Sequence, residues 1–171
     1  RPAGVVWDLL DRSIVMNVES IMTTPVQVCR TNQTAQSALR LMRDHDCGCI
    51  PVVDHDVVVG IVTDRDIALA AAQADKSPSQ LRLSQIMTNK VFVVGPETSV
   101  ADAEVMMREQ QIRRLPVVDQ DSRPIGMLSI NDIARAGAAA HWHSDDGLTA
   151  HSVAATLAAI CETSVSQPLV V

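Results

Sequence analysis

The most informative part of this chain is Ile50-Pro51-Val52-Val53-Asp54 followed by Gly60-Ile61-Val62-Thr63-Asp64-Arg65-Asp66, because the same pattern returns later. It reappears as Leu115-Pro116-Val117-Val118-Asp119 and Gly126-Met127-Leu128-Ser129-Ile130-Asn131-Asp132. Pro51 and Pro116 are 116 − 51 = 65 positions apart, and Gly60 and Gly126 are 126 − 60 = 66 apart, so the second copy has one more residue in its hairpin. A repeat of this length is one supersecondary unit that buries its apolar face against its twin.

Each copy predicts the order strand, helix, strand, strand, helix, which is a mixed α+β fold. In the first copy, alternating valines predict a strand at 26–29, and Thr34 caps a helix with an apolar stripe at spacings of three and four. Apolar, β-branched runs predict strands at 49–53 and 57–62, and Thr63 begins the second helix. The predicted division is an N-terminal extension 1–15, a first domain 16–75, a second domain 81–140 and a C-terminal extension 141–171 with one helix.

Composition limits the kinds of partner. The net charge is −6 and the basic residues are scattered, which argues against DNA or RNA as a partner. Only Trp7, Phe92 and Trp142 are aromatic, too few to form a stacking platform for single strands. No apolar run approaches the roughly 20 residues that cross a bilayer, so no membrane partner is expected.

The cysteines and the N-terminus favour a cytoplasmic protein. Cys29, Cys47, Cys49 and Cys161 do not form the dense disulfide framework of a small secreted domain. The N-terminus lacks the basic and then apolar layout of a secretory signal. Cys47 and Cys49 would share one face of an extended segment, but no second pair of ligands is placed to complete a structural zinc site. We therefore expect no metal.

Two repeated segments, 63–66 and 129–132, carry the candidate chemistry. Each predicts a strand that ends at a hydroxyl residue and turns directly into a helix, whose free N–H groups form an anion site. Asp66 and Asp132 would project from the first helical turn, where a carboxylate can accept hydrogen bonds from two ribose hydroxyls. Thr63 and Ser129 would then contact phosphate. The alternative is that both segments are capping boxes that only stabilise the helix starts.

The copies differ where their second strands begin. The first has Gly48, which allows a flat base to approach the backbone, whereas the second has Arg113 and Arg114, which suit phosphate recognition. Arg65 can also reach a phosphate, although the neighbouring Asp64 opposes an anion. The alternative for the two arginines is that they are solvated charges at a strand edge. We expect the two sites to have unequal affinities.

This doubled pattern resembles a pair of CBS domains over residues 18–140. The resemblance rests on Met-Thr before the first strand, the apolar-Pro-Val-Val-Asp motif, and Gly-apolar-apolar-Thr/Ser-x-x-Asp after the third strand. It implies two β-α-β-β-α units packed about a pseudo-twofold axis, with a cleft beside each unit for an adenosine-containing ligand. The resemblance then implies the following ligand-binding residues: Thr24, Val26, Gly48, Ile50, Pro51, Thr63, Arg65, Asp66, Val91, Arg113, Arg114, Pro116, Ser129 and Asp132.

We therefore expect a regulatory module that binds AMP or ATP, with NAD and S-adenosylmethionine as further candidates, and that signals through dimer shape or partner binding. Proteins similar to this pair into a homodimer through the helices that follow each sheet, here 67–72 and 133–138. A protein target is expected but not identified. The sequence gives no support for catalysis. It contains no nucleophile beside a placed histidine, no Walker-type glycine loop, and no paired carboxylates on one element other than those of the repeated helix caps. The alternatives are a dimerisation scaffold with vestigial clefts and a redox- or zinc-responsive protein.

Overall fold

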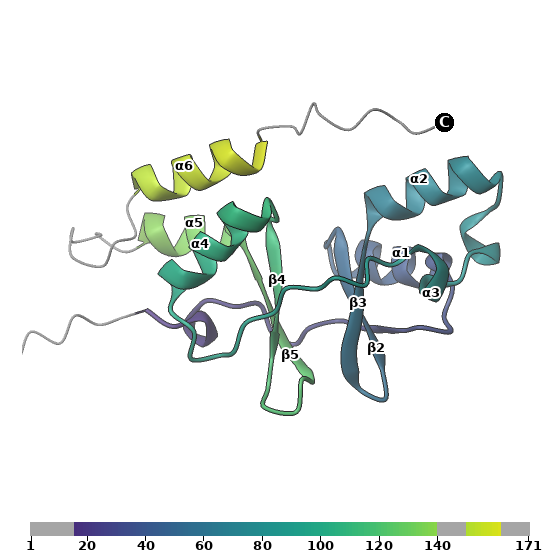
Figure 1. Ribbon diagram of the computed structural model, residues 1–171, viewed down its shortest axis with the longest axis horizontal. Helices are drawn as coiled ribbons and strands as arrows, with labels where there is room; N and C mark the ends of the chain where they lie inside the picture. The colour runs from purple at the N-terminus through teal and green to yellow at the C-terminus, as the bar shows by residue number, and fades with distance from the viewer. Residues whose placement is uncertain (1–15, 140–149, 162–171) are drawn as a thin grey trace, which may run out of the picture.

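Two similar halves lie side by side in the computed structural model, which describes residues 16–139 and 150–161 (Figure 1). The predicted N-terminal extension 1–15 and part of the C-terminal extension lie outside the described residues. The first half contains β1 (Cys29–Arg30), α1 (Ala35–Asp44), β2 (Cys49–Asp54), β3 (Val57–Thr63) and α2 (Asp64–Ala74). The second half contains α4 (Val100–Gln110), β4 (Arg114–Val118), β5 (Pro124–Ser129) and α5 (Ile130–Ala139).

The sheets follow the repeat. In the first half β1 pairs parallel with β2, and β2 pairs antiparallel with β3. In the second half β4 and β5 form the same hairpin, and the first strand is reduced to a parallel bridge between Val94 and Val117. These two residues correspond to Cys29 and Val52, which pair in β1 and β2. The mixed α+β fold is therefore confirmed, with an incomplete first strand in the second copy.

The predicted first strand at 26–29 is wrong in extent, because only Cys29 and Arg30 are paired as a strand. The preceding segment crosses between the halves and lines a cleft, so it has no neighbouring strand to complete a ladder. The predicted helix start at Thr34 is confirmed: its side chain accepts a hydrogen bond from the Ser37 N–H. The apolar stripe of α1 is also confirmed, with Ala35, Ala38 and Met42 buried.

Short lead-in segments of each half pack into the other half. The first lead-in contains the 3₁₀-helix η1 (Val18–Ser20), and Val18 is buried in the core of the second half. The second contains η2 (Pro78–Gln80) and α3 (Leu83–Ile86), and Leu83 is buried in the core of the first half. Each half therefore needs a piece of chain from the other repeat to complete its core.

The lead-ins also extend the sheets across the repeat boundary. The Thr23 and Met127 backbones exchange hydrogen bonds of 2.9 and 3.1 Å, and Thr88 and Ile61 exchange equivalent bonds of 2.9 and 3.0 Å. This pairing places the residues after each lead-in beside the helix start of the opposite half. Because of this crossing, any cleft at a helix start is built from both repeats.

The repeated glycines make this crossing possible. A Cβ atom added at Gly60 would lie 2.4 Å from the Sδ atom of Met87, and one at Gly126 would lie 2.4 Å from the Sδ of Met22. Both methionines belong to the lead-in segments. Glycine is therefore required in each copy because a methionine from the other copy packs directly on its backbone.

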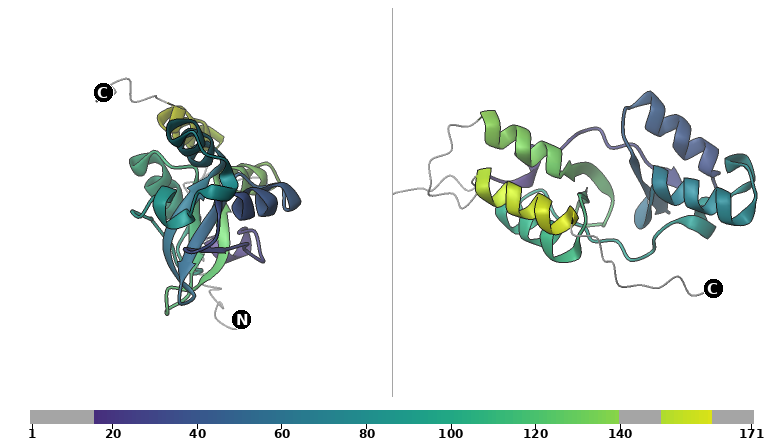
Figure 2. Two further views of the ribbon diagram at one scale, coloured as in Figure 1. Left: turned by 90° about the vertical axis from the view of Figure 1, so that its right-hand side faces the viewer. Right: turned by 90° about the horizontal axis from the view of Figure 1, so that it is seen from above.

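The predicted C-terminal helix is present as α6 (Ala150–Cys161), which packs against α4 and α5 (Figures 1 and 2). Val153 and Thr156 face this contact and are buried. Glu104 of α4 is also buried and accepts hydrogen bonds from Thr156 Oγ1 at 2.7 Å and Ser152 Oγ at 3.2 Å. In the first repeat the equivalent of Glu104 is Leu39. Among the described helices, none is long and apolar enough to cross a membrane.

Candidate functional site

Two clefts lie where a helix start of one repeat faces the crossing segment of the other. We call them the Asp132 cleft, with a volume of about 630 Å³, and the Asp66 cleft, with a volume of about 440 Å³. The Asp132 cleft is formed by residues 23–27, the start of β2, and the region from β5 into α5. The Asp66 cleft is formed by residues 88 and 90–92, the start of β4, and the region from β3 into α2. The clefts are therefore equivalent under the repeat.

The predicted aspartates both cap the helix that carries them. Asp66 Oδ2 accepts hydrogen bonds from the Thr63 N–H at 2.9 Å and from the Thr63 hydroxyl at 2.7 Å. In return, the Asp66 N–H donates a hydrogen bond to Thr63 Oγ1 at 3.1 Å. Asp132 Oδ2 accepts the Ser129 N–H at 2.8 Å and the Ser129 hydroxyl at 2.6 Å. Both segments therefore form capping boxes, and each carboxylate uses a single oxygen for the cap.

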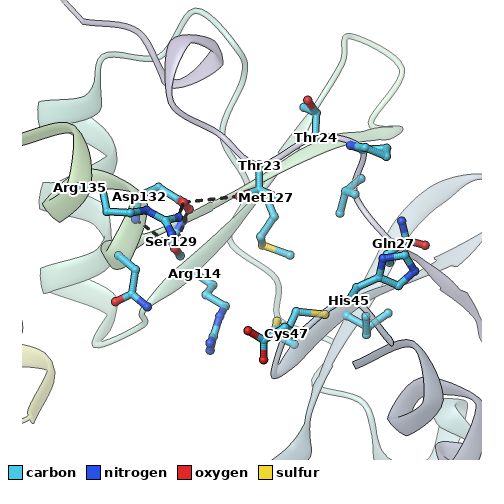
Figure 3. A pocket seen from close by; sticks show the side chains of 16 residues that line it. Thr23, Thr24, Gln27, His45, Cys47, Arg114, Met127, Ser129, Asp132 and Arg135 are labelled. Atoms are coloured by element: carbon cyan, nitrogen blue, oxygen red, sulfur yellow. Dashed lines mark hydrogen bonds and ion pairs between the residues drawn. The ribbon is translucent and has the colours of Figure 1, made fainter. Parts of the chain in front are cut away.

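The second oxygen of each aspartate distinguishes the clefts. Asp132 Oδ1 pairs with the Arg135 guanidinium and lies 3.5 Å from the Thr23 hydroxyl (Figure 3). The Asp132 side chain is 5% exposed, whereas that of Arg135 is 75% exposed. Within the described residues Asp66 Oδ1 accepts no hydrogen bond and forms no salt bridge. The position equivalent to Arg135 is Leu69, which cannot form an ion pair.

The charges lining the clefts also differ. The Asp66 cleft contains one carboxylate, Asp66, and three cations, Lys90, Arg113 and Arg114. Its apolar walls include Val91, Phe92 and Ile112, and the Lys90 ammonium lies 5.0 Å from the centre of the Phe92 ring. The Asp132 cleft has two carboxylates, Asp46 and Asp132, and two cations, Arg114 and Arg135, together with His45. Only the Asp66 cleft carries a clear positive excess.

Most of the residues predicted from the sequence are brought together by the fold. The Asp132 cleft is lined by Thr24, Val26, Ile50, Arg114, Ser129 and Asp132. The Asp66 cleft is lined by Thr63, Asp66, Val91, Arg113 and Arg114. Gly48 lies beside a smaller pocket of about 170 Å³ between the two helix starts, next to the Asp64 carboxylate.

Three predicted residues line none of these cavities. Pro51 and Pro116 are buried within β2 and β4, where the Pro116 carbonyl accepts the Val94 N–H at 3.1 Å. Arg65 is exposed on α2. A wider hollow of about 760 Å³, lined by residues within 93–98 and 118–121, contains no predicted site residue. The geometry therefore places these three residues away from the clefts.

Several cleft residues were missed by the sequence analysis. Gln27, His45, Cys47 and Arg135 line the Asp132 cleft, and Thr88, Lys90 and Phe92 line the Asp66 cleft. Thr88 and Lys90 align with Thr23 and Pro25, which also line a cleft but were not predicted, so the repeat offset relates these residues without identifying them. Arg135 could have been found as a charge that has replaced Leu69 one turn after the repeated aspartate. His45 and Cys47 carry no comparable signal.

The buried cysteines are poorly suited to redox or metal chemistry. Burial raises the pKa of the Cys49 thiol to about 12 and that of Cys29 to about 11, so both stay protonated at neutral pH. All four cysteines are free thiols. Among residues 16–139 and 150–161, no group of three or more His, Cys, Asp or Glu side chains is placed to hold a metal ion.

Comparisons with known proteins agree with this geometry. The sequence profile of the CBS domain matches residues 18–73 and 83–139. The chain is 41% identical over 118 residues to the CBS domain-containing protein YhcV of Bacillus subtilis, covering 69% of this chain and 83% of that protein.

Two solved structures are also similar to this chain. One is the CBS domain pair of protein MJ0100 in complex with 5'-methylthioadenosine and S-adenosyl-L-methionine, with a TM-score of 0.67, 29% identity, and coverage of 73% and 98% of the two chains. The other is Hypoxic Response Protein I with two coordinated zinc ions, with a TM-score of 0.64, 30% identity, and coverage of 70% and 98%. This chain therefore belongs to the CBS domain family and contains two copies of that domain.

Proposed function

We propose that this protein is a non-enzymatic regulatory module that binds an adenosine nucleotide, AMP or ATP, in the Asp66 cleft. The observation that carries the proposal is the free Oδ1 of Asp66, which lies in a cleft that also contains three cations. A carboxylate oxygen with no partner can accept the two hydroxyls of a ribose while the other oxygen keeps the helix capped. The capping and ligand-binding interpretations are thus compatible.

The remaining walls suit the other parts of a nucleotide. Val91, Ile61 and Ile112 offer an apolar slot for a flat base, and the cleft volume of about 440 Å³ lies within the ordinary range for small-molecule sites. Lys90, Arg113 and Arg114 provide the positive charge for phosphate. The N–H groups in the first turn of α2, which the sequence predicted to form an anion site, already donate hydrogen bonds to the Gly48 carbonyl, Asp64 Oδ1 and Thr63 Oγ1. A phosphorylated adenosine would place its ribose at Asp66, its base in the apolar slot and its phosphate near the three cations.

The Asp132 cleft suits a less anionic adenosine ligand. Its charges balance, and its aspartate is already paired with Arg135. The adenosine compounds bound by MJ0100 support ligands of the same class here, including S-adenosylmethionine and NAD as further candidates. We propose that a ribose in this cleft displaces Arg135 from Asp132 Oδ1.

We propose that the signal passes through a homodimer to an unidentified protein target. The face of α2 exposes Leu69, whose side chain is 50% exposed, whereas α5 is packed against α6 of the same chain. The two predicted dimer surfaces, 67–72 and 133–138, are thus unequally available, and pairing through α2 is the simpler arrangement. The cytoplasmic location remains a prediction from the sequence.

A ligand panel tests the proposal. Thermal unfolding is measured with AMP, ADP, ATP, NAD and S-adenosylmethionine, for the wild type, Asp66→Ala and Asp132→Ala. A ligand at 100 times its dissociation constant stabilises the folded state by about 2.7 kcal/mol. The proposal expects stabilisation by AMP or ATP that is lost in Asp66→Ala. No response to any of these compounds would refute it.

The second candidate function is a dimerisation scaffold with vestigial clefts, and the paired, buried Asp132 is the observation that favours it. In that case the sedimentation of the protein would be identical with and without nucleotide. A zinc-responsive function has no supporting cluster in the described part of the chain. Elemental analysis of the purified protein decides this third alternative.

A further inference from the structure

Arg114 lies at the boundary between the two clefts. It lines the Asp132 cleft, the Asp66 cleft and the small pocket of about 170 Å³ that separates the two helix starts. In Figure 3 its side chain lies between Ser129 of one repeat and Cys47 of the other, and it does not join the hydrogen-bonded group around Asp132. Within the described residues its guanidinium forms no salt bridge. It is therefore available to a ligand from either side.

The repeat explains why one residue reaches both clefts. Arg114 begins β4 and pairs with Ser129, and its equivalent Cys49 begins β2 and pairs with Thr63. Cys49 also lines both clefts. This position therefore faces both sites in each repeat, but only the second copy places a cation there. Two equivalent clefts share a single guanidinium.

The charge of each cleft depends differently on this arginine. Without Arg114, the lining of the Asp66 cleft would still contain two cations, Lys90 and Arg113, and one carboxylate, Asp66, so its net charge would stay positive. The Asp132 cleft would keep only Arg135 against Asp46 and Asp132, and so it becomes negative. An anionic ligand in the Asp132 cleft therefore needs Arg114 more than one in the Asp66 cleft does.

We infer that the two clefts compete for the Arg114 guanidinium, so a phosphorylated ligand in the Asp66 cleft weakens the binding of a phosphorylated ligand in the Asp132 cleft. This inference rests on the proposed nucleotide function and adds the regulation of the site. Bidentate contact with a phosphate fixes the guanidinium in one geometry. Linkage requires the weakening to be reciprocal. An uncharged nucleoside does not engage the arginine, and its binding to the two clefts is independent.

The test needs a reporter for one cleft. Cys47 is half-buried and lines the Asp132 cleft but not the Asp66 cleft, so a ligand in the Asp132 cleft shields it from iodoacetamide. Alkylation of the Cys47 peptide is followed by mass spectrometry in a Cys161→Ser background, while AMP or adenosine is titrated. The Asp66→Asn variant weakens nucleotide binding in the Asp66 cleft by removing the carboxylate charge, while the asparagine oxygen can still cap the helix.

The competition predicts that AMP protects Cys47 at a concentration at least about fivefold lower in Asp66→Asn than in the Asp66 protein, which is the lower range of measured site couplings. Adenosine should protect Cys47 equally in both. Adding Arg114→Gln should abolish the AMP difference, whereas Arg113→Gln, a matched control at a residue absent from the Asp132 cleft, should retain it.

Other outcomes separate this inference from the proposed function. Equal AMP protection with and without Asp66→Asn, or no AMP protection in either protein, overturns the competition. The proposed function still stands in that case if calorimetry detects AMP binding to the wild type. Absence of both AMP and ATP binding by calorimetry overturns both.

Discussion

The two clefts are built from equivalent segments, yet their aspartates are used differently. Asp66 caps α2 through one oxygen and leaves the other without a partner, whereas Asp132 caps α5 and also pairs with Arg135. The repeat therefore preserves the structural role of the aspartate in both copies. The two aspartates differ in their second oxygen. Asp132 pairs with Arg135 one turn later, whereas the equivalent position after Asp66 is Leu69, which cannot pair. The difference separates the shared architecture of the two clefts from the ligand preference that we propose for each.

The largest expected effect concerns the feature that the two halves share. Gly60→Ala and Gly126→Ala should each destabilise the protein by about 1–3 kcal/mol, because the added methyl group overlaps a methionine of the other repeat. Chemical denaturation measures the change. Gly95→Ala is the matched control, since its methyl group would meet only Thr98 Oγ1 at 3.8 Å. A large loss for only one of the first two variants would show that the crossing is not equivalent in the two halves.

The next effect concerns α6, which covers the second half alone. Thr156→Val should destabilise the protein by about 1–3 kcal/mol, because it deprives the buried Glu104 carboxylate of its 2.7 Å hydrogen bond. Combining it with Glu104→Leu, which introduces the residue found at Leu39, should recover most of the loss because both polar groups are then replaced. Denaturation of the single and double variants forms a thermodynamic cycle. Purely additive losses would contradict a specific contact.

A smaller effect is expected from exchanging the residues that distinguish the clefts. Arg135→Leu should strengthen adenosine binding in the Asp132 cleft by about two- to fivefold, because the arginine of this ion pair is solvent-exposed and such a pair contributes about 1 kcal/mol or less. Leu69→Arg should weaken adenosine binding in the Asp66 cleft by a similar factor. Calorimetric titration with adenosine measures both changes. If neither affinity moves, the second oxygen of the aspartate does not set the preference.

The smallest effect is a pH dependence located in the first half. The folded pKa values of Cys49 and Cys29, about 12 and about 11, lie above the ordinary thiol value of 9.0. Because the unfolded chain loses these protons first, the free energy of unfolding should be unaffected below pH 9 and should fall as the pH rises above it. Cys29→Val, which introduces the residue of Val94, should reduce this fall. An unchanged pH profile in that variant would argue against the buried thiol as its source.

The repeat made much of the fold predictable. Helix starts at Thr34 and Thr63 and the hairpins after Pro51 and Pro116 follow from local chemistry, because caps and strand alternation are read within a few residues. The crossing of the lead-in segments was not predicted. Local propensity does not determine which repeat a lead-in segment packs against. That choice depends on tertiary contacts such as those of Met87 with Gly60 and Met22 with Gly126.

The candidate site was predictable to a lesser degree. The two aspartates and the hydroxyl residues before them were located by the repeat, and Arg114 by the difference between the copies. Arg114 lines both clefts because the start of β4 lies beside the start of β2. This is a tertiary contact, which the sequence pattern does not predict. The pairing of Arg135 with Asp132 was missed because the sequence analysis stopped at the first helical turn.

The proposed difference between the clefts is tested most directly by calorimetric titration of AMP into the wild type, Asp66→Asn and Asp132→Asn. Asparagine retains an oxygen for the helix cap, so the loss of a ribose acceptor is separated from the loss of the cap. We predict that Asp66→Asn weakens AMP binding by about tenfold or more, the effect of losing a charged hydrogen bond, and that Asp132→Asn weakens the tightest site less. AMP binding that is unchanged in Asp66→Asn would contradict the assignment of the nucleotide site to the Asp66 cleft.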